Sequence, residues 1–491
     1  MHNVAGCTIF RSDPEEGLKF VHLMKEIAPL PDKTLKRAVI AVASVTSFVT
    51  PFMASAINVA LPGIHDELHM DAVLLAWVAT SYLLSTAAFV LPFGKAGDIY
   101  GRKRVYVSGM VIFTASSLFA ALAGSVYHLL LARVFQGIGS AMIFSTSMAI
   151  LTSVFPPTER GRAIGITVSS VYVGLSVGPF LGGILTYYLG WRSVFGAAIP
   201  LGMLACYLSA RYLKEEWADA RGEKLDLTGS ILYAGAIALV MLGFSVLPSK
   251  TSFWKIGGGT ILFVLFVLWE LRVQWPVFDV KLFKNNRTFA FSSLAALVNY
   301  SATFAVTFML SLYLQYIQGL DARSAGFILM TQPLVMATFS PFAGMMSDRI
   351  EPRKVASVGM AVTATGLFGM IFLESETSIG FIIADLLVLG FGFALFSSPN
   401  MNAIMSSVEK RFYGIAAGAV ASMRLLGQMF SMGVATLVLS LYVGPVEMSP
   451  THYAAFLNSV NAAFLIFACL CTAGIFASIA RGRVRDPGGL D

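Results

Sequence analysis

The sequence predicts an all-α polytopic membrane protein with about fourteen membrane-spanning helices. Of its 491 residues, 56% are hydrophobic and only 12% are charged, and the mean hydropathy is +0.75. Soluble domains carry roughly a quarter charged residues, and single soluble cores stop growing near about 250–300 residues. A chain this long and this apolar therefore needs lipid around much of its surface.

The apolar residues fall into runs of the length that crosses a bilayer as a helix, about 20 residues. They lack the ten-residue alternation of barrel strands, and only helices satisfy their own backbone hydrogen bonds in lipid without closing a barrel. In order, the expected spans are residues 38–62, 72–93, 105–124, 127–151, 163–188, 193–213, 228–248, 254–274, 288–316, 324–346, 355–373, 378–400, 412–440 and 458–480.

The lysines and arginines predict the orientation of these spans. They cluster in the even-numbered loops and near the termini, whereas the odd-numbered loops hold only Arg192, Lys250, Lys255 and Arg323. By the positive-inside rule both termini lie in the cytoplasm, and we expect the plasma membrane as the location. The net charge of +7 follows from these loops and does not indicate a nucleic-acid surface.

An internal repeat predicts two halves. Residues 93–109 (FGKAGDIYGRKRVYVSG) align without a gap to residues 343–359 (AGMMSDRIEPRKVASVG) at an offset of 250, so that Asp98 meets Asp348. Parallel repeats are a known transporter architecture, although a chance match of two glycine-basic loops is the alternative.

The expected organisation follows from the repeat, because the two spans left over fall between the halves. It comprises a cytoplasmic leader (1–37), an N-terminal six-helix bundle (38–213), a linker with two extra spans (214–287), a C-terminal six-helix bundle (288–480) and a cytoplasmic tail (481–491).

The loop between the second and third spans carries the strongest motif. Gly94 and Gly101 permit a tight turn. Asp98 can accept backbone hydrogen bonds at a helix start and pair with Arg102 or Arg104, so we expect a latch that switches with conformation. A plain positive-inside loop is the alternative, but it explains neither the glycines nor the aspartate. This loop resembles the signature of the major facilitator superfamily.

Further motifs narrow the resemblance to the 14-spanner drug:proton antiporter family of the EmrB and QacA type. They are Asn58 to Pro62, Trp77, Tyr82 to Leu84, Trp191-Arg192 with Phe195, Pro200 to Gly202, and Tyr313 to Gln315 with Gly319 and Ala325-Gly326. The resemblance implies two six-helix bundles plus two extra central helices. It also implies proton-coupled export of small amphipathic compounds by alternating access. Import or facilitated passage of one specific solute, such as an anion, is the alternative.

Three charged residues stand well inside expected spans of the two bundles, away from the span ends. They are Arg133 in the fourth, Asp385 in the twelfth and Arg424 in the thirteenth. An intramembrane charge costs roughly 2.5–3.5 kcal/mol, so it usually faces a partner or a water-filled cavity. The resemblance links Arg133 to proton coupling, and it places spans four and twelve on the central cavity. We therefore expect Asp385 to carry the proton and Arg133 to face it, against the alternatives of a structural ion pair and an interfacial acid.

Two further sets of residues complete the expected site. The resemblance makes the fifth-span glycines and proline an antiporter motif, although ordinary close packing and a bend explain them as well; they are Gly174, Gly178, Pro179, Gly182 and Gly183. The second set gives substrate-cavity contacts, or else polar packing between helices: Met53, Asn58, Asn299, Tyr300 and Gln315. Many family members have an acid where Met53 stands, which argues against a broad spectrum of cationic drugs.

Enzymatic activity is not expected. The sequence has neither a Walker loop nor a His-Glu-x-x-His motif, and the glycines around Ser176 lie in mid-helix rather than at a strand-to-helix turn. We expect no cofactor, no metal and no nucleic acid. The expected partners are a small-molecule substrate, protons and the lipid bilayer, with a monomer as the working unit.

Overall fold

The computed structural model describes residues 33–482 except 156, 214, 248, 279, 409–412, 445 and 447. Within these residues all regular structure is helical. Fourteen segments are long and apolar enough to cross a membrane, which confirms the predicted fold class. The expected leader and tail lie outside the described residues, apart from residues 33–37 and 481–482.

The first half of the chain forms six long helices. They are α2 (Lys33–Leu68), α3 (Ala72–Tyr100), α4 (Arg102–Ala121), α5 (Val126–Val154), α6 (Pro157–Leu189) and α7 (Arg192–Tyr212). Within this group α2 packs against α6, α5 against α3 and α4, and α7 against α4. The first helix continues past Pro62 to Leu68, beyond its expected end. The next helix, α3, is capped by Asp71, whose carboxylate accepts from the backbone N–H of Leu74 at 2.7 Å.

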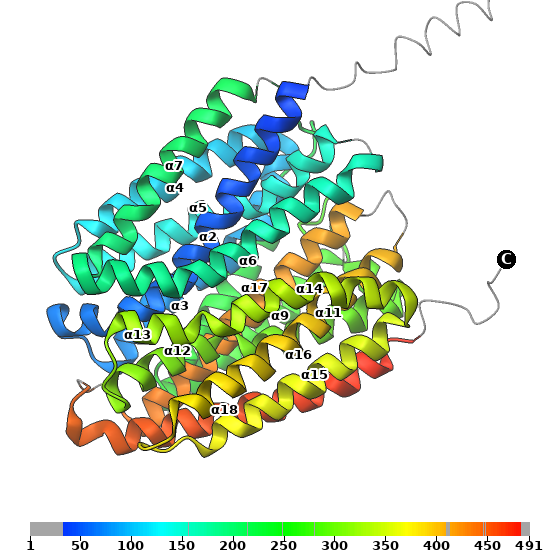
Figure 1. The fold of residues 1–491 in the computed structure, drawn as a ribbon. Coiled ribbons are helices and arrows are strands. Elements are labelled where there is room, and N and C mark those ends of the chain that lie inside the picture. The colour runs from blue at the N-terminus through cyan, green and yellow to red at the C-terminus, as the bar shows by residue number, and fades with distance from the viewer. Residues whose placement is uncertain are drawn as a thin grey trace, which may run out of the picture.

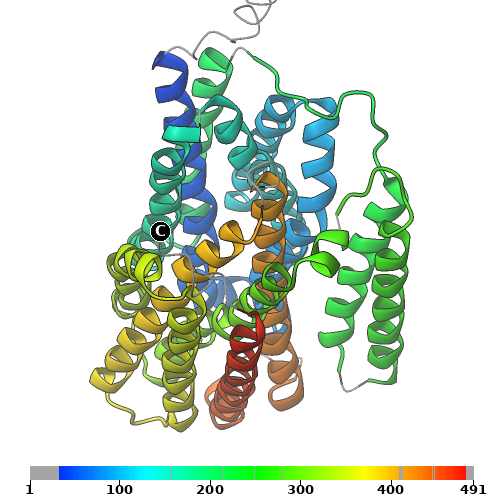
Figure 2. The ribbon, with the colours of Figure 1, turned by 90° about the vertical axis from the view of Figure 1, so that its right-hand side faces the viewer.

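Two helices follow that belong to neither group, α8 (Leu227–Phe244) and α9 (Lys250–Glu270). They pack chiefly against each other, and α8 also contacts α3 and α17. Figure 2 shows the pair, in green, at the flank of the molecule. Much of α9 is exposed, including Phe253 and Trp254. Such an apolar surface fits a helix that faces lipid.

The second half contains the remaining elements. They are α10 (Val280–Asn285), α11 (Arg287–Thr303), α12 (Ala305–Leu312), the π-helical turn η1 (Tyr313–Ile317), α13 (Ala322–Leu329), α14 (Thr331–Arg349), α15 (Pro352–Gly369), η2 (Met370–Phe372), α16 (Ile379–Ser406), α17 (Tyr413–Tyr442), η4 (Pro450–His452) and α18 (Tyr453–Ala480). The expected ninth span is thus built from α11, α12 and η1, and the tenth from α13 and α14. Figure 1 shows this half beside the first, and the pairs α3–α17, α6–α13 and α2–α12 join them.

Within each half, a pair of glycines lets two neighbouring helices pack closely, and the two contacts are equivalent. A Cβ added at Gly139 would lie 2.7 Å from the carbonyl oxygen of Gly109, which brings α5 onto α4. A Cβ added at Gly392 would lie 2.9 Å from the carbonyl oxygen of Gly359, which brings α16 onto α15. Because only glycine permits such close approach of two helices, the repeat found in the sequence corresponds to a repeated packing.

Candidate transport pathway

The two halves meet in a polar seam at one end of the molecule. Ser311 of α12 donates to the carbonyl oxygen of Asn58 at 2.7 Å, and the Gln315 amide donates to the carbonyl oxygen of Val59 at 3.3 Å. Asn58 and Gln315 therefore lie where α2 meets α12 and η1. Met53 is fully buried in α2. Of these expected cavity residues, Asn58 and Gln315 contribute to a closed junction between the halves.

The fifth-span glycines let α6 touch two partners. A Cβ at Gly182 would lie 2.8 Å from the Cβ of Ala56 on α2, and Cβ atoms at Gly174 and Gly178 would meet the same helix. A Cβ at Gly183 would collide with the carbonyl oxygen of Ala322, on α13 in the other half. Conversely, a Cβ at Gly326 of α13 would collide with the carbonyl oxygen of Pro179. The motif thus lies at the seam.

Arg133 is fully buried inside the first half. Its Nε donates to the carbonyl oxygen of Val78 at 2.8 Å, and its Nη1 donates to Oε1 of Gln136 at 2.5 Å. The guanidinium lies over the Tyr82 ring, 4.4 Å from its centroid. The Gln136 amide in turn donates to Ser117 at 2.8 Å. The side chain therefore joins α3, α4 and α5.

Asp385 lies in the other half, against α15. Its carboxyl oxygens lie 3.0 and 3.1 Å from a Cβ built at Gly369, and one lies 3.3 Å from a Cβ built at Gly366. The residue is 8% exposed, and Oδ2 has no hydrogen-bond partner among the described residues. The structure does not bring Arg133 and Asp385 together, because each side chain faces a neighbouring helix of its own half.

Arg424 lies where the halves face each other. Its guanidinium lies 5.6 Å from the ring centroid of Phe144, on α5, and it interacts with the Tyr300 hydroxyl, on α11. Nearby, the hydroxyls of Tyr172 on α6 and Ser397 on α16 are 3.0 Å apart, and Ser397 also interacts with Tyr300.

Asn299, the neighbour of Tyr300, is fully buried. Both atoms of its amide lack a hydrogen-bond partner among the described residues. The expected cavity residues therefore do not lie together. Asn58 and Gln315 lie at the seam, Tyr300 lies beside Arg424, and Met53 and Asn299 are fully buried.

The glycine-basic loop differs from the expected turn. Gly94 lies inside α3, so Gly101 alone, at φ 118°, makes the turn into α4. The Asp98 carboxylate pairs with Arg102 at 2.7 Å, whereas Arg104 pairs with Glu216 at 3.6 Å. The side chain of Asp348, the repeat counterpart of Asp98, lies outside the described residues.

The acidic partners of this loop come from the segment between α7 and α8. Glu216 accepts from the backbone N–H of Lys103 at 2.9 Å, so it, rather than Asp98, caps the start of α4. Asp219 pairs with Arg102 at 2.8 Å, and Glu223 pairs with Lys95 at 2.5 Å. Sequence reasoning missed these three acids; the available signal was the number of acidic residues between positions 215 and 226, in an expected cytoplasmic loop.

Arg481 was expected in the cytoplasmic tail but is fully buried at the end of α18. Its Nη1 donates to the Asn400 amide oxygen at 2.9 Å, and its Nε donates to the carbonyl oxygen of Ser478 at 2.8 Å. Burial lowers the pKa of Arg481 to about 10. The residue ties α18 to α16.

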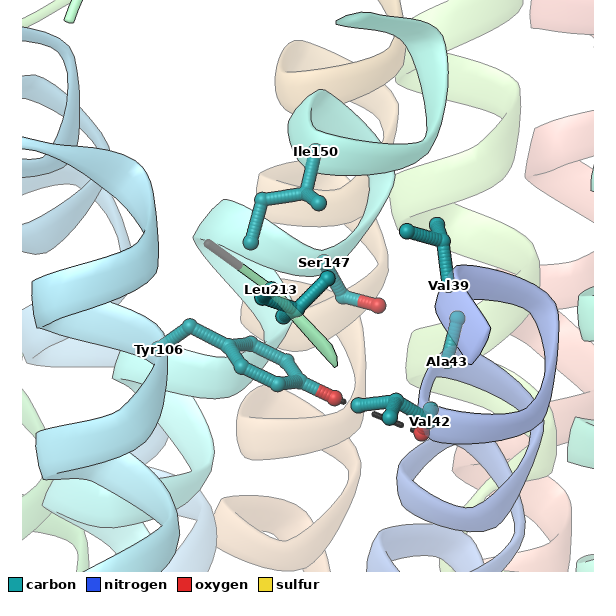
Figure 3. Close-up of a pocket in the computed structure, with 7 residues that line it drawn as sticks. All are labelled: Val39, Val42, Ala43, Tyr106, Ser147, Ile150 and Leu213. Atoms are coloured by element: carbon teal, nitrogen blue, oxygen red, sulfur yellow. Dashed lines mark hydrogen bonds between the residues drawn. The ribbon is translucent and has the colours of Figure 1, made fainter. Parts of the chain in front are cut away.

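The pocket in Figure 3 is too small for a transported solute. It holds about 10 Å³ between α2, α4 and α5, with Leu213 beyond the end of α7 completing its lining, and such a space admits about one water molecule. In it the Tyr106 hydroxyl donates to the carbonyl oxygen of Val42 at 3.3 Å.

Relatives of known name match most of the chain. The riboflavin transporter RibZ of Clostridioides difficile is 29% identical over 442 residues, covering 89% of this chain and 96% of the relative. The multidrug resistance protein Stp of Mycobacterium tuberculosis is 30% identical over 396 residues, covering 79% and 73%. The cephamycin export protein CmcT of Amycolatopsis lactamdurans is 30% identical over 402 residues, covering 79% and 82%.

Solved structures share the fold. A bacterial homologue of the human lysosomal transporter Spinster, inward-facing and unoccupied, superposes with a TM-score of 0.66 at 16% identity and covers 92% of this chain and 98% of that chain. A D-xylose-proton symporter gives 0.64 at 14% identity, with 90% and 96% covered. Residues 43–285 and 292–489 match the family model of the Major Facilitator Superfamily. With fourteen candidate membrane helices and this match, the chain belongs to the Major Facilitator Superfamily and is a multi-pass membrane transporter.

Proposed function

We propose that the chain is a proton-coupled antiporter that exports small amphipathic compounds by alternating access. The observation that carries the proposal is the glycine contact between α6 and α13, where Gly183 and Gly326 let the halves close. Across this contact Arg323 of α13 donates one hydrogen bond to the Tyr188 hydroxyl of α6 at 3.1 Å. Among the described residues no ion pair joins the two helices, so the contact can open as a reversible gate requires. The names of Stp and CmcT, each 30% identical to this chain, support export.

The proposal assigns the moving parts as follows. Residues 38–213 and 288–480 act as the two halves, and residues 214–287 form a linker that carries two extra helices. The basic loops support a cytoplasmic location for both termini, and the proposal takes the protein to work as a monomer in the plasma membrane. The closed seam then lies on the outer side.

Import or facilitated passage of one specific solute is the second candidate. Met53 stands where many family members carry an acid, and the relative RibZ, which matches the chain over 89% of its length, is named a riboflavin transporter.

Transport in proteoliposomes separates the two candidates. The purified protein is reconstituted, and a panel of amphipathic dyes is followed with and without an imposed pH gradient. Antiport predicts dye accumulation against its gradient, with proton flow in the opposite direction. Movement that only equilibrates the dye, whatever the pH gradient, would favour the facilitator.

A further inference from the structure

We propose that the cluster around Arg424 binds the anionic group of an aromatic organic anion, and that such anions are the transported substrate class. The cluster consists of Phe144, Tyr172, Tyr300, Phe393, Ser397 and Arg424. The proposal rests on the transporter function proposed above and names its substrate.

Among the described residues, no acidic side chain pairs with Arg424. Its contacts are the Phe144 ring and the Tyr300 hydroxyl. Arg133, the other arginine deep in a span, has a carbonyl and an amide oxygen as acceptors. Since an intramembrane arginine needs a partner or a water-filled cavity, the missing negative charge at Arg424 is assigned to the cargo.

The cluster draws on both halves. Phe144 and Tyr172 come from α5 and α6, while Tyr300 and Arg424 come from α11 and α17. The Tyr172 and Ser397 hydroxyls meet across the junction at 3.0 Å. A ligand held here contacts both halves, so its binding can bias their relative position, as alternating access requires.

The chemistry of the cluster selects an aromatic anion. A guanidinium binds carboxylate, sulfonate or phosphate through paired hydrogen bonds. The rings of Tyr300 and Phe393 pack edge to face with centroids 5.4 Å apart, and Phe144 adds a further ring surface. The hydroxyls of Tyr172, Tyr300 and Ser397 supply hydrogen bonds to polar substituents. A cation would find no acid in this cluster.

Two dyes with one ring system test the assignment. Fluorescein, an anion, and rhodamine 123, a cation, share the xanthene skeleton. Their binding to the full chain in phosphatidylcholine nanodiscs is measured by fluorescence anisotropy. We expect the wild type to prefer fluorescein and Arg424→Gln to weaken fluorescein binding by at least about tenfold, with rhodamine 123 unchanged or tighter. Arg272→Gln, an exposed arginine outside the cluster, should change neither.

Further variants keep the test decisive if Arg424→Gln does not fold. Arg424→Lys retains the charge and should keep part of the preference for fluorescein, whereas Phe144→Leu and Tyr300→Phe should each weaken it. Equal affinity for both dyes in the wild type, or fluorescein binding that survives all four cluster variants, overturns the proposal. Displacement of fluorescein by added phosphatidylglycerol would assign the arginine to a lipid headgroup and also overturn it.

The test separates this inference from the proposed function. Fluorescein that binds through Arg424 but is not driven by a pH gradient would refute proton antiport and leave the anion site standing. Proton-driven export of rhodamine 123 without fluorescein binding would refute the anion site and leave the antiporter standing.

Discussion

Arg133 shows how one buried charge can organise three helices. Its two hydrogen bonds end on α3 and on Gln136 of its own helix, and Gln136 continues the chain of contacts to Ser117 of α4. A guanidinium in this setting depends on every acceptor it has, because an unpaired buried charge is costly. In the described structure, Arg133 therefore links three helices within the first half.

Gln136→Leu is expected to destabilise the protein. The substitution removes an acceptor from Arg133 and a donor from Ser117, and a buried polar group left unpaired costs about 1–3 kcal/mol. Thermal unfolding followed by circular dichroism measures the effect. Ser117→Ala, which leaves the contact between Gln136 and Arg133 intact, should cost less. Equal stability of Gln136→Leu and wild type would contradict a stabilising role for the hydrogen bonds of Arg133 and Gln136.

Asp385 remains our proposed proton carrier, now without Arg133 as its partner. Oδ2 of Asp385 accepts no hydrogen bond from the described residues, and the carboxyl group lies beside two glycines. A proton can therefore bind to this oxygen without displacing a hydrogen-bond donor. Asp385→Asn should abolish uphill, proton-driven transport and preserve downhill exchange of substrate, as measured in proteoliposomes. Full gradient-driven transport by that variant would rule the residue out.

A matched pair of glycine substitutions tests the enclosure itself. In Gly369→Ala the new methyl group would lie about 3 Å from the carboxyl oxygens, so it should reduce coupled transport. Gly380→Ala on α16 has no atom within 4 Å of its new Cβ and serves as the control.

The charged positions themselves could be predicted from the sequence, but their partners could not. A charged residue within an apolar run can be recognised from the sequence alone. Which neighbour a side chain meets depends on the rotation of its helix about its own axis, and a turn of one residue changes the facing helix. Arg133 and Asp385 both lie within candidate membrane helices, yet each side chain packs inside its own half.

At the scale of elements, the junction between α3 and α4 is held by charges from a distant segment. The sequence located the loop and offered Arg102 or Arg104 as the partner of Asp98. The structure pairs Asp98 with Arg102 and leaves the turn to Gly101 alone. The sequence did not reveal Glu216, Asp219 and Glu223, because these acids lie more than a hundred residues along the chain, beyond three further helices. Only the return of the chain after α7 brings them to the basic loop.

Asp98→Asn is expected to slow transport while substrate binding persists. The Asp98 carboxylate pairs with Arg102, which also contacts Asp219 and Ser153. Loss of this carboxylate therefore loosens the loop and leaves the ligand contacts intact. Transport rate and ligand affinity are measured on the same preparation. Glu216→Gln, which removes the charge but keeps an acceptor for the start of α4, should show a weaker defect. Loss of binding in folded Asp98→Asn would disprove the latch.

At the scale of the whole molecule, most of the architecture follows from the sequence. The number of spans, the two extra helices and the repeat were all predictable, since length and apolarity define a membrane helix and glycines at matched positions define the packing. The break at α12–η1 was not, because no proline or charge marks it in the sequence. The break at α13–α14 lies beside Pro333, whose missing N–H interrupts the helix, and sequence reasoning did not use this signal.

Labelling with a membrane-impermeant maleimide tests the orientation. In a chain with its natural cysteines replaced, single cysteines at Asp66 and Glu376, both exposed, should react from outside intact cells. A cysteine at Lys103 should react only after the cells are permeabilised. Reaction of Lys103→Cys in intact cells would show that the predicted topology is reversed, with the closed seam on the cytoplasmic side.

An anionic cargo bound at Arg424 would also determine how the transporter responds to voltage. A cycle that carries a univalent anion out and a proton in moves two positive charges inward. Each charge is worth roughly 2.3 kcal/mol per 100 mV, so the membrane potential alone would supply about 4.6 kcal/mol, enough for a gradient of more than about a thousandfold. Export should therefore accelerate steeply with an inside-negative potassium diffusion potential, even at equal pH on both sides. An exporter of univalent cations with the same proton count would be electrically silent.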